Sequence, residues 1–385
     1  MKAELIEKLI LAHKTGSEAK FRAAVEDLAS DEERKGNIRL SKQIRDSYSG
    51  KNSNSTLIRG SKRGDQNLEY ISPSSFVSAP RDNESKLELY DVVTPTTLLS
   101  DLVLPENQTD LLNQIMAEAE KNEMLIAKNL PPANRLLLCG PPGCGKSMTA
   151  YAIANELGLP LAYVRLDGLV SSYLGQTSVN LRKVFDSISN KRLVLFLDEF
   201  DAIAKKRDDS NEMGELKRVV TALLQNFDNM SSSVFLIAAT NHDHLLDPAI
   251  WRRFNYVMKL DLPKLEQRQT LIEKWFKAYS LEHRTNIKLL ATITEGMSPA
   301  GIQELIISVA KKQVTSGNTV DITNVIRILI QQLTNNADQD AEIDAALTLN
   351  QRGVSERQLA KALGVSHTTL NYRLGKARDG FEENG

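Results

Sequence analysis

Residues 140–147 read Gly140-Pro141-Pro142-Gly143-Cys144-Gly145-Lys146-Ser147, which matches the spacing G-x-x-x-x-G-K-[ST]. The apolar run 136–139 before them predicts a buried strand, and 147–157 after them predicts a helix. In that setting the glycines let backbone N–H groups point at phosphate oxygens, and the helix N-terminus adds positive potential. We expect Lys146 to reach the β- and γ-phosphates of a nucleotide, Ser147 to hold Mg²⁺ and Met148 to line the same site.

Two adjacent carboxylates follow a second apolar run about 50 residues later in the chain. The run 193–197 is continuous and apolar, and it ends in Asp198 and Glu199. This is the Walker B arrangement, in which Asp198 helps to hold Mg²⁺ through its water shell. Glu199 is then the base that polarises the attacking water. Together with the phosphate loop, this pair predicts hydrolysis of a nucleoside triphosphate.

A third apolar run is followed by an amide side chain and, further along the chain, by two arginines. The run 234–239 ends in Thr240 and Asn241, and Asn241 at the strand tip is placed to orient water near the γ-phosphate. The segment after it contains Leu246-Asp247-Pro248-Ala249-Ile250-Trp251-Arg252-Arg253-Phe254.

With these motifs the segment 92–334 resembles an AAA+ ATPase of the branch that contains the membrane-bound proteases, the segregases and the microtubule-severing enzymes. The resemblance implies that Asn241 is the first sensor and that Arg252 and Arg253 project into the site of a neighbouring subunit. A guanidinium from that neighbour would stabilise charge on the transferring phosphoryl group. The branch commonly has Pro-Gly between the two arginines, whereas here they are adjacent. Either of them therefore stays a candidate, the other making a structural ion pair.

The resemblance also implies a loop that grips polypeptide. Tyr173, Leu174 and Gly175 align with the aromatic–hydrophobic–glycine loop that lines the central pore of hexamers in this branch. An aromatic ring contacts any polypeptide without sequence preference, and glycine lets the loop move. The charged segment Lys205 to Gly214 aligns with a second pore loop, and Ser298-Pro299 begins a helix of the lid.

These motifs must be positioned by an α/β fold. Strands are expected at 135–139, 161–166, 192–197, 234–240 and 256–260, alternating with helices, which predicts a P-loop parallel sheet covered by helices. We expect an N-terminal helical docking module at 1–48, a flexible linker at 49–90, the nucleotide-binding domain at 91–262, a helical lid at 263–334 and a helix-turn-helix at 338–380.

The C-terminal unit has two serine-capped helix starts. Ser355 with Gln358 forms a capping box, and Ser366 begins the next helix after a turn at Gly364. The unit resembles a helix-turn-helix of the resolvase and repressor type, and its recognition helix is expected at about 367–375. The residues expected to face a DNA groove are His367, Thr368, Asn371 and Arg373. The same architecture also serves protein docking, which stays an alternative.

Composition excludes some classes of protein and indicates the cellular compartment. The 385 residues include 48 Lys+Arg and 49 Asp+Glu, so the whole chain is no general polyanion binder, although a local basic face is possible. No stretch approaches the length of a membrane-spanning helix, and no membrane partner is expected. Both cysteines, Cys139 and Cys144, lie at the phosphate loop, where a disulfide would distort the backbone, so a reducing cytoplasm is expected.

Two functions follow as hypotheses. The first is an ATP-hydrolysing homo-oligomeric ring, expected to be a hexamer, that threads and unfolds a protein substrate past Tyr173, with residues 1–48 docking a partner protein. The second is a DNA-directed ATPase that its helix-turn-helix recruits for regulation, replication or transposition. ATP and Mg²⁺ are the expected cofactors of both. A nucleotide switch without hydrolysis is disfavoured by Glu199 and Arg252.

Overall fold

The computed structural model describes residues 23, 27 and 30 and the ranges 79–82, 88–130, 133–164, 166, 174–204, 213–281, 285–316, 321–334 and 339–382. The chain divides into two compact units, Met1–Tyr70 and Ile71–Gly385. In the first unit only Ala23, Asp27 and Ser30 are described, all three in helical conformation, so the expected docking module and most of the expected linker lie outside the described residues. None of the helices in the described ranges is both long and apolar enough to cross a membrane.

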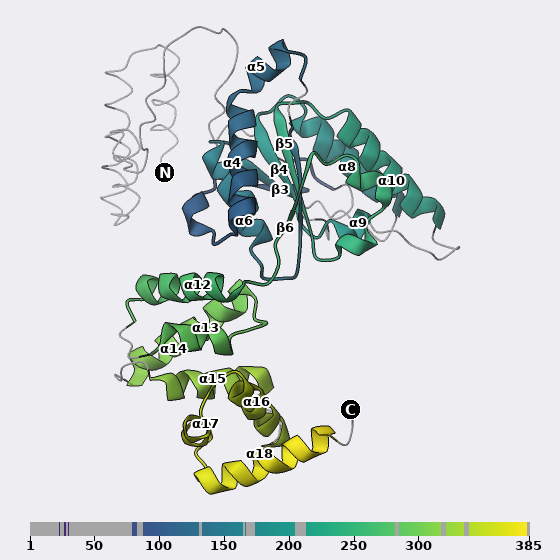
Figure 1. Cartoon of the computed structure of the whole chain (residues 1–385). Coiled ribbons are helices and arrows are strands. Elements are labelled where there is room, and N and C mark those ends of the chain that lie inside the picture. Colours follow the sequence, from purple (N-terminus) through teal and green to yellow (C-terminus); the bar gives the residue numbers. More distant parts are fainter. Residues whose placement is uncertain are drawn as a thin grey trace. The chain divides into compact units, whose positions relative to one another are not determined.

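A six-stranded sheet forms the centre of the second unit (Figure 1). Its order is β1-β3-β4-β5-β2-β6, and every pairing is parallel except that of β1 with β3. The strands are β1 (Tyr90–Val93), β2 (Arg135–Cys139), β3 (Leu161–Val164), β4 (Leu193–Leu197), β5 (Val234–Thr240) and β6 (Tyr256–Lys259). The α/β class predicted from the sequence is confirmed, and each of the five expected strands is present, three of them one or two residues shorter.

Helices cover both faces of this sheet, which explains why its strands read as continuous apolar runs. In β4 the side chains of Leu193, Leu195 and Leu197 enter one hydrophobic cluster with α8 and α10, whereas Val194 and Phe196 enter another with α4 and α6. Figure 1 shows α4 and α6 on one side of the strands and α8 and α10 on the other. The helices of this part are α4 (Glu106–Glu120), α5 (Asn122–Ala127), α6 (Lys146–Glu156), α8 (Leu174–Ile188), α9 (Asp201–Ala204), α10 (Met213–Asp228) and α11 (Pro248–Trp251), with 3₁₀ turns η2 (Leu99–Asp101) and η3 (Asp243–Leu245).

Strand β1 was missed by the sequence analysis. It pairs antiparallel with β3, Tyr90 opposite Val164, at the edge of the sheet. The Leu89 N–H donates to the Pro80 carbonyl, and Leu89 and Tyr90 are almost fully buried. The last residues of the segment expected as a linker therefore belong to the core of the sheet domain. Four residues at a sheet edge carry too weak a periodicity to be recognised from the sequence.

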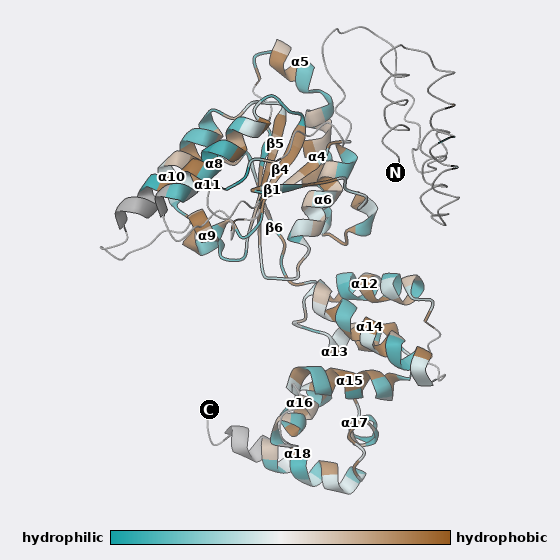
Figure 2. Ribbon diagram, turned by 180° about the vertical axis from the view of Figure 1, so that it is seen from behind, coloured by the Kyte–Doolittle hydropathy of each residue, from teal (hydrophilic) through white to brown (hydrophobic). Residues whose placement is uncertain are grey.

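The rest of the second unit is helical, as expected from residue 264 onward. It contains α12 (Leu265–Ala278), α13 (Ile287–Ile293), α14 (Pro299–Ser316), α15 (Ile322–Thr334), α16 (Gln339–Gln351), α17 (Glu356–Leu363) and α18 (His367–Glu382). One continuous hydrophobic cluster runs from α12 to α18. Figure 2 shows apolar colour on α15 at the centre of this group and more polar colour on α18.

Helix α15 joins the expected lid to the C-terminal helices. Its buried side chains include Val325, Ile326, Ile328, Leu329 and Ile330, which form a wide apolar face, whereas Asn324, Arg327 and Gln331 lie on a less buried polar side. An apolar face of that width packs against more than one partner, here α14, α16 and α17. The C-terminal helices share a core with the lid and do not fold around a core of their own.

The helix starts and the helix end that the sequence indicates for α17 and α18 are present in the structure. The Ser355 side chain accepts from the Gln358 N–H in a capping box at the start of α17. Gly364 has φ of 73°, a left-handed conformation that glycine adopts at little cost, and it ends that helix. Ser366 Oγ accepts from the Thr369 N–H at 3.1 Å to begin α18, which extends to Glu382 and is longer than expected.

Candidate functional site

The carboxyl ends of β2, β4 and β5 meet at one edge of the sheet and carry the residues that the sequence singles out. In the register of β2 and β5, Cys139 lies opposite Thr240, so the phosphate loop and Asn241 leave neighbouring strands at the same level. Asp198 and Glu199 follow β4, the strand on the other side of β5. Open α/β sheets bind ligands at this edge.

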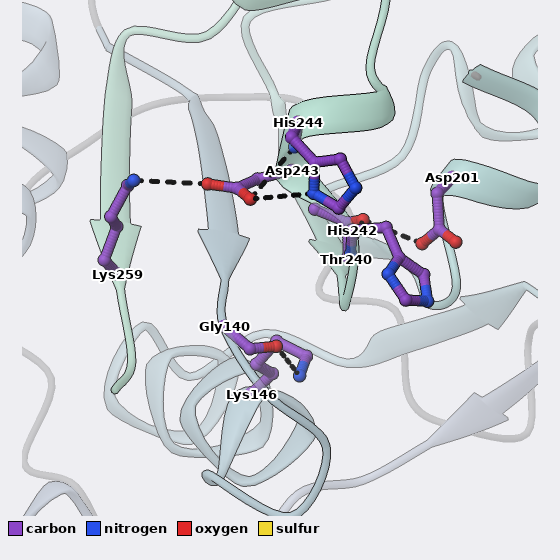
Figure 3. A network of polar contacts seen from close by, with 8 residues as sticks. All are labelled: Gly140, Lys146, Asp201, Thr240, His242, Asp243, His244 and Lys259. Atoms are coloured by element: carbon purple, nitrogen blue, oxygen red, sulfur yellow. Dashed lines mark hydrogen bonds and ion pairs between the residues drawn. The ribbon is translucent and has the colours of Figure 1, made fainter. Parts of the chain in front are cut away.

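The phosphate loop is held in a conformation that needs its glycines. Gly140, Gly143 and Gly145 have φ of 141°, 75° and 92°. Lys146 Nζ donates to the carbonyls of Gly140 at 2.7 Å and Pro141 at 2.9 Å, so the ammonium group lies within the loop (Figure 3). Burial lowers the pKa of Lys146, and burial likewise raises the pKa of Cys139 to about 12. Both cysteines are free and buried.

Replacing Gly140 with alanine is expected to destabilise the fold by about 3 kcal/mol or more and to remove ATP binding. A Cβ at this position would lie 2.1 Å from the backbone oxygen of Leu260, which has no side-chain freedom to move away. The measurements are urea unfolding and equilibrium ATP binding. The matched control is Gly158→Ala, which also has positive φ but meets no atom within 4 Å, and its expected cost is about 1–2 kcal/mol. Equal losses of stability in the two variants would contradict the steric argument.

Asp198 is the centre of a polar cluster at the end of β4. Its Oδ2 accepts from the Ser147 hydroxyl at 3.1 Å and from the Tyr163 hydroxyl at 3.3 Å. Its Oδ1 accepts from the Glu199 N–H at 2.9 Å. Burial, together with the charge of Asp198, raises the pKa of Tyr163 to about 12, so Tyr163 remains a hydrogen-bond donor. Tyr163 was not expected at this site, because nothing in the sequence of a strand shows which residue of the next strand its side chain will contact.

Glu199 has φ of 51°, a left-handed conformation that is rare for a residue with a side chain. The adjoining backbone is fixed, since the Phe200 N–H donates to the Ala239 carbonyl at 2.8 Å. Such conformations cost free energy and persist where the surrounding structure enforces them, commonly at functional sites. The turn places Glu199 and Asp198 on the wall of one cleft.

A second polar network holds the segment that follows β5 (Figure 3). The Thr240 hydroxyl donates to Asp201 at 2.7 Å and accepts from the His242 N–H at 3.0 Å. Asp243 forms an ion pair with Lys259 of β6 at 3.2 Å. These contacts fix the backbone on both sides of Asn241, which lines the same cleft as the two carboxylates. In the sequence, only the polar character of the turn indicates these contacts.

The cleft has a volume of about 500 Å³ and lies between the sheet edge and the helical region. The phosphate loop, Asp198, Glu199 and Asn241 form one wall. The other wall was not foreseen, and its members come from the segment before α4, from α12 and from α14: Asp101, Leu102, Val103, Leu104, Leu271, Lys274, Trp275, Pro299, Ala300 and Gln303. Only the resemblance to a known lid pointed to these helices, since the individual positions carry no motif.

The lid is connected to the phosphate loop and to the segment before α4. The Ala300 N–H at the start of α14 donates to the Gly143 carbonyl at 3.2 Å. Lys274 Nζ donates to the Asp101 carbonyl at 2.7 Å and pairs with its carboxylate at 3.0 Å. Hydrogen bonding to Lys274 lowers the pKa of Asp101. A backbone hydrogen bond therefore links the phosphate loop directly to the start of α14.

The two arginines after α11 have different surroundings. Arg253 binds Asp228 through two hydrogen bonds, Nε to Oδ1 at 3.3 Å and Nη2 to Oδ2 at 3.2 Å, and donates to the Ala249 carbonyl at 3.3 Å. Arg252 is exposed and has no side-chain hydrogen bond or ion pair with any residue in the described ranges. Arg253 is thus engaged at the end of α10, whereas the Arg252 guanidinium is available to another molecule.

The structure describes only some of the other residues that the sequence singled out. Tyr173 lies outside the described residues, Leu174 and Gly175 begin α8, and most of the expected second pore loop, 205–212, is also outside them. In the C-terminal region Thr368 and Asn371 are exposed, His367 lies 3.6 Å from Glu356, and Arg373 is half-buried.

Part of the chain matches a known protein family, and a longer part is similar to an individual protein of that family. Residues 136–262 match the family described as "ATPase family associated with various cellular activities (AAA)". An uncharacterised AAA family ATPase, y4kL, of Sinorhizobium fredii is 38% identical over 276 residues, which cover 72% of this chain and 79% of that protein.

Two archaeal proteins named proteasome-activating nucleotidase are also similar to the chain. The one from Saccharolobus solfataricus is 30% identical over 249 residues, which cover 61% of this chain and 63% of that protein. The one from Saccharolobus islandicus (strain Y.N.15.51 / Yellowstone #2) is 28% identical over 260 residues, which cover 65% of this chain and 66% of that protein. The similarity to these two proteins thus spans somewhat less than two thirds of their length.

Proposed function

The chain belongs to the AAA family of ATPases and hydrolyses ATP, and from that premise we propose that it is an oligomeric ring that uses this hydrolysis to remodel a protein substrate. The observation that carries the proposal is the meeting of the phosphate loop, Asp198, Glu199 and Asn241 in one cleft that the lid also lines. Its similarity to proteasome-activating nucleotidases supports a protein as substrate. We propose a hexamer, the assembly implied by the branch that the sequence resembles.

The residues of the cleft have clear roles in hydrolysis. The backbone N–H groups of the phosphate loop and Lys146 bind the phosphates, and Lys146 exchanges its two carbonyl partners for phosphate oxygens. The Ser147 hydroxyl and the Asp198 carboxylate, already hydrogen-bonded, are oxygen donors of the kind that Mg²⁺ prefers. Mg²⁺ bound there would neutralise charge on the phosphates. Glu199 orients and polarises the attacking water, and Asn241 holds it beside the γ-phosphate.

Arg252 supplies the remaining positive charge to a neighbouring subunit in this proposal. The Arg253–Asp228 bridge anchors α11 to the end of α10, so it positions Arg252 and leaves it exposed. A guanidinium delivered in this way stabilises the charge of the transferring phosphoryl group. Hydrolysis would then require assembly, and the order of hydrolysis around the ring would follow from contact between subunits.

Tyr173 is proposed to grip the substrate polypeptide in the pore. In a Glu199→Gln background, which holds ATP without hydrolysing it, Tyr173→Ala is expected to reduce the polypeptide that co-purifies with the ring by about tenfold or more. The reason is the loss of a large apolar contact that does not depend on substrate sequence. The measurement is quantitative mass spectrometry of the bound polypeptide. Tyr173→Phe keeps the ring and is expected to retain the polypeptide, whereas equal retention by the alanine variant would contradict the threading role.

A second function, DNA-directed ATPase, is favoured by one observation in the C-terminal region. Helices α17 and α18 are joined by a tight turn at Gly364, and the part of α18 around Asn371 is exposed and polar. We propose that DNA recruits the remodelling ring in this case, so the two functions are compatible. The mechanism of hydrolysis is the same in both.

A further inference from the structure

A groove of about 980 Å³ lies in the helical region, between α15, α16 and the turn that joins α13 to α14. None of the residues that line it lines the nucleotide cleft, and none belongs to α17 or α18. Its base is apolar, formed by Ile293, Leu329 and Leu347, which are almost fully buried. Leu333 at its edge is 50% exposed. Open hollows with apolar walls commonly mark the places where another molecule binds.

The charges at this groove favour a cationic ligand. Glu295 and Asp344 line it and are exposed, and neither carboxylate forms an ion pair with a residue in the described ranges. Asp340 lies one turn before Asp344 and so on the same side of α16. The C-terminal end of α15 reaches the groove at Thr334, and a helix C-terminus carries partial negative charge. Lysine or arginine side chains of a partner would be attracted to this surface.

The walls of the groove indicate the conformation of its ligand. They are mostly helices, whose backbone groups are hydrogen-bonded within each helix, so an extended peptide would find few partners for its own N–H and C=O groups. A bound helix satisfies those groups internally. The lining residues of α16 run from Ala341 to Arg352, a length of about 16 Å and about three helical turns. Ala341 and Ala345 are small and half-buried, which lets a second helix come close to α16.

The turn that forms one wall of the groove also touches the phosphate loop. Residues 295–297 line the groove, and the next residue, Ser298, lies beside the loop, since a Cβ added at Gly143 would be 2.7 Å from Ser298 Oγ. On the opposite wall, Arg352 donates through Nη1 to the Ile293 carbonyl at 3.1 Å, just before this turn. A molecule bound in the groove would therefore contact a segment that holds the phosphate loop on its other side.

We propose that this groove binds a basic amphipathic helix of a partner protein and that the partner thereby regulates ATP binding. The apolar residues of that helix, spaced i, i+3, i+4 and i+7, pack on Leu329, Leu333 and Met297. Its lysine or arginine side chains pair with Glu295 and Asp344. The partner is a regulator bound outside the nucleotide cleft, so the proposal depends neither on the substrate of the ring nor on DNA.

The test starts from a display library of helical peptides about four turns long. Each carries a fixed apolar stripe, and the positions on both sides of the stripe are randomised among lysine, glutamate and glutamine. The library is selected for binding to the full-length chain, and affinities are then measured by fluorescence anisotropy. Lysine-rich peptides are expected to be enriched. No enrichment, or enrichment of glutamate-rich or uncharged peptides, would overturn the proposal.

Asp344→Lys gives the sharpest result, because it reverses the charge preference. It is expected to weaken binding of the enriched peptide by about tenfold and to strengthen binding of the same peptide with glutamate in place of lysine. Unfolding cannot produce two effects of opposite sign. The matched control is Glu304→Lys, the same change of charge at an exposed residue of α14 outside the groove. The proposal fails if the two variants bind both peptides alike.

Leu333→Gln tests the apolar contact separately from charge. It is expected to weaken binding of both peptides by about tenfold, because each loses the same apolar contact. The melting temperature should change by no more than about 2 °C, since half of the Leu333 side chain is already exposed. Unchanged binding of the enriched peptide in this variant would show that it binds elsewhere. A synthetic peptide of residues 1–16 that binds the groove more tightly than any enriched peptide would assign it to a second copy of this chain.

The regulatory part is tested with a non-hydrolysable ATP analogue. A saturating concentration of the enriched peptide is expected to change the affinity for the analogue by about fivefold or more. The analogue should change the affinity for the peptide by the same factor, since coupling between two sites is reciprocal. Neither measurement requires hydrolysis or a substrate polypeptide, so a failure of protein remodelling leaves both unaffected. Peptide and nucleotide that bind independently would overturn regulation through this groove.

Discussion

Glu199→Gln is expected to lower the rate of ATP hydrolysis by about 10²–10⁴-fold and to leave ATP affinity nearly unchanged, because only the base for the attacking water is removed. The amide keeps the size and the polar character of the side chain but no longer attracts the proton. The backbone of Glu199 has a left-handed conformation, and the adjoining Phe200 N–H donates to the Ala239 carbonyl. The substitution changes neither of these, so the turn that carries the residue should be preserved. Steady-state phosphate release and equilibrium binding of a fluorescent ATP analogue provide the two measurements.

The matched control for this prediction is Glu156→Gln, on the last turn of α6 and outside the residues that line the cleft. It is expected to hydrolyse ATP at the rate of the unchanged protein. Glu199→Gln with normal hydrolysis would show that another group is the base. Loss of ATP affinity in the same variant would show that its effect is on folding or binding. If the prediction holds, the variant retains its substrate and can be used to identify it.

Arg252→Ala is expected to lower kcat by about 10³–10⁵-fold, the range found where a guanidinium from outside the site stabilises phosphoryl transfer. Arg253→Ala has a different expected result. It breaks a partly exposed ion pair with Asp228 whose contribution to the free energy of unfolding is about 1 kcal/mol or less, and it acts on hydrolysis only through the position of α11. The structure thus suggests different roles for two adjacent residues that the sequence leaves equivalent.

Mixing subunits provides the decisive measurement for Arg252. Lys146→Ala rings have no working phosphate loop but keep Arg252, whereas Arg252→Ala rings have the loop but no guanidinium. When the two inactive proteins are dissociated and reassembled together, hydrolysis is expected to return at those interfaces where an intact loop meets an intact arginine. Mixtures that stay inactive, although hybrid rings form, would contradict delivery of Arg252 to a neighbouring subunit.

Much of the nucleotide site could be predicted from the sequence because its parts are local. Each of the three motifs follows an apolar run, and the carboxyl ends of parallel strands necessarily meet at one sheet edge. The phosphate loop requires positive φ at several positions, which is why glycine occurs there and why the pattern is recognisable. The helix starts at Ser355 and Ser366 could be predicted for the same reason, since a capping residue acts on its own first turn.

The lid side of the cleft depends on contacts between distant segments. Lys274 contacts Asp101, from which it is 173 positions away in the sequence. Ala300 at the start of α14 contacts Gly143 of the phosphate loop. Neither contact leaves a periodic signal in the sequence. Tyr163 meets Asp198 only because β3 and β4 are neighbours in the sheet. The chemistry of one wall of the cleft could therefore be predicted from the sequence, whereas the residues of the other wall could not.

The sequence by itself determined the class of this protein, the reaction it catalyses and the residues proposed to bind the phosphates, because those residues follow apolar strands directly in the sequence and the carboxyl ends of parallel strands meet at one sheet edge. The tertiary structure alone decided three further matters: that Arg253 is engaged by Asp228 while Arg252 remains exposed, that β1 completes the sheet edge, and that α15 joins the C-terminal helices to the lid. Each of these depends on which surfaces are buried against one another. Burial is a property of the packed chain, and a short run of residues does not reveal it.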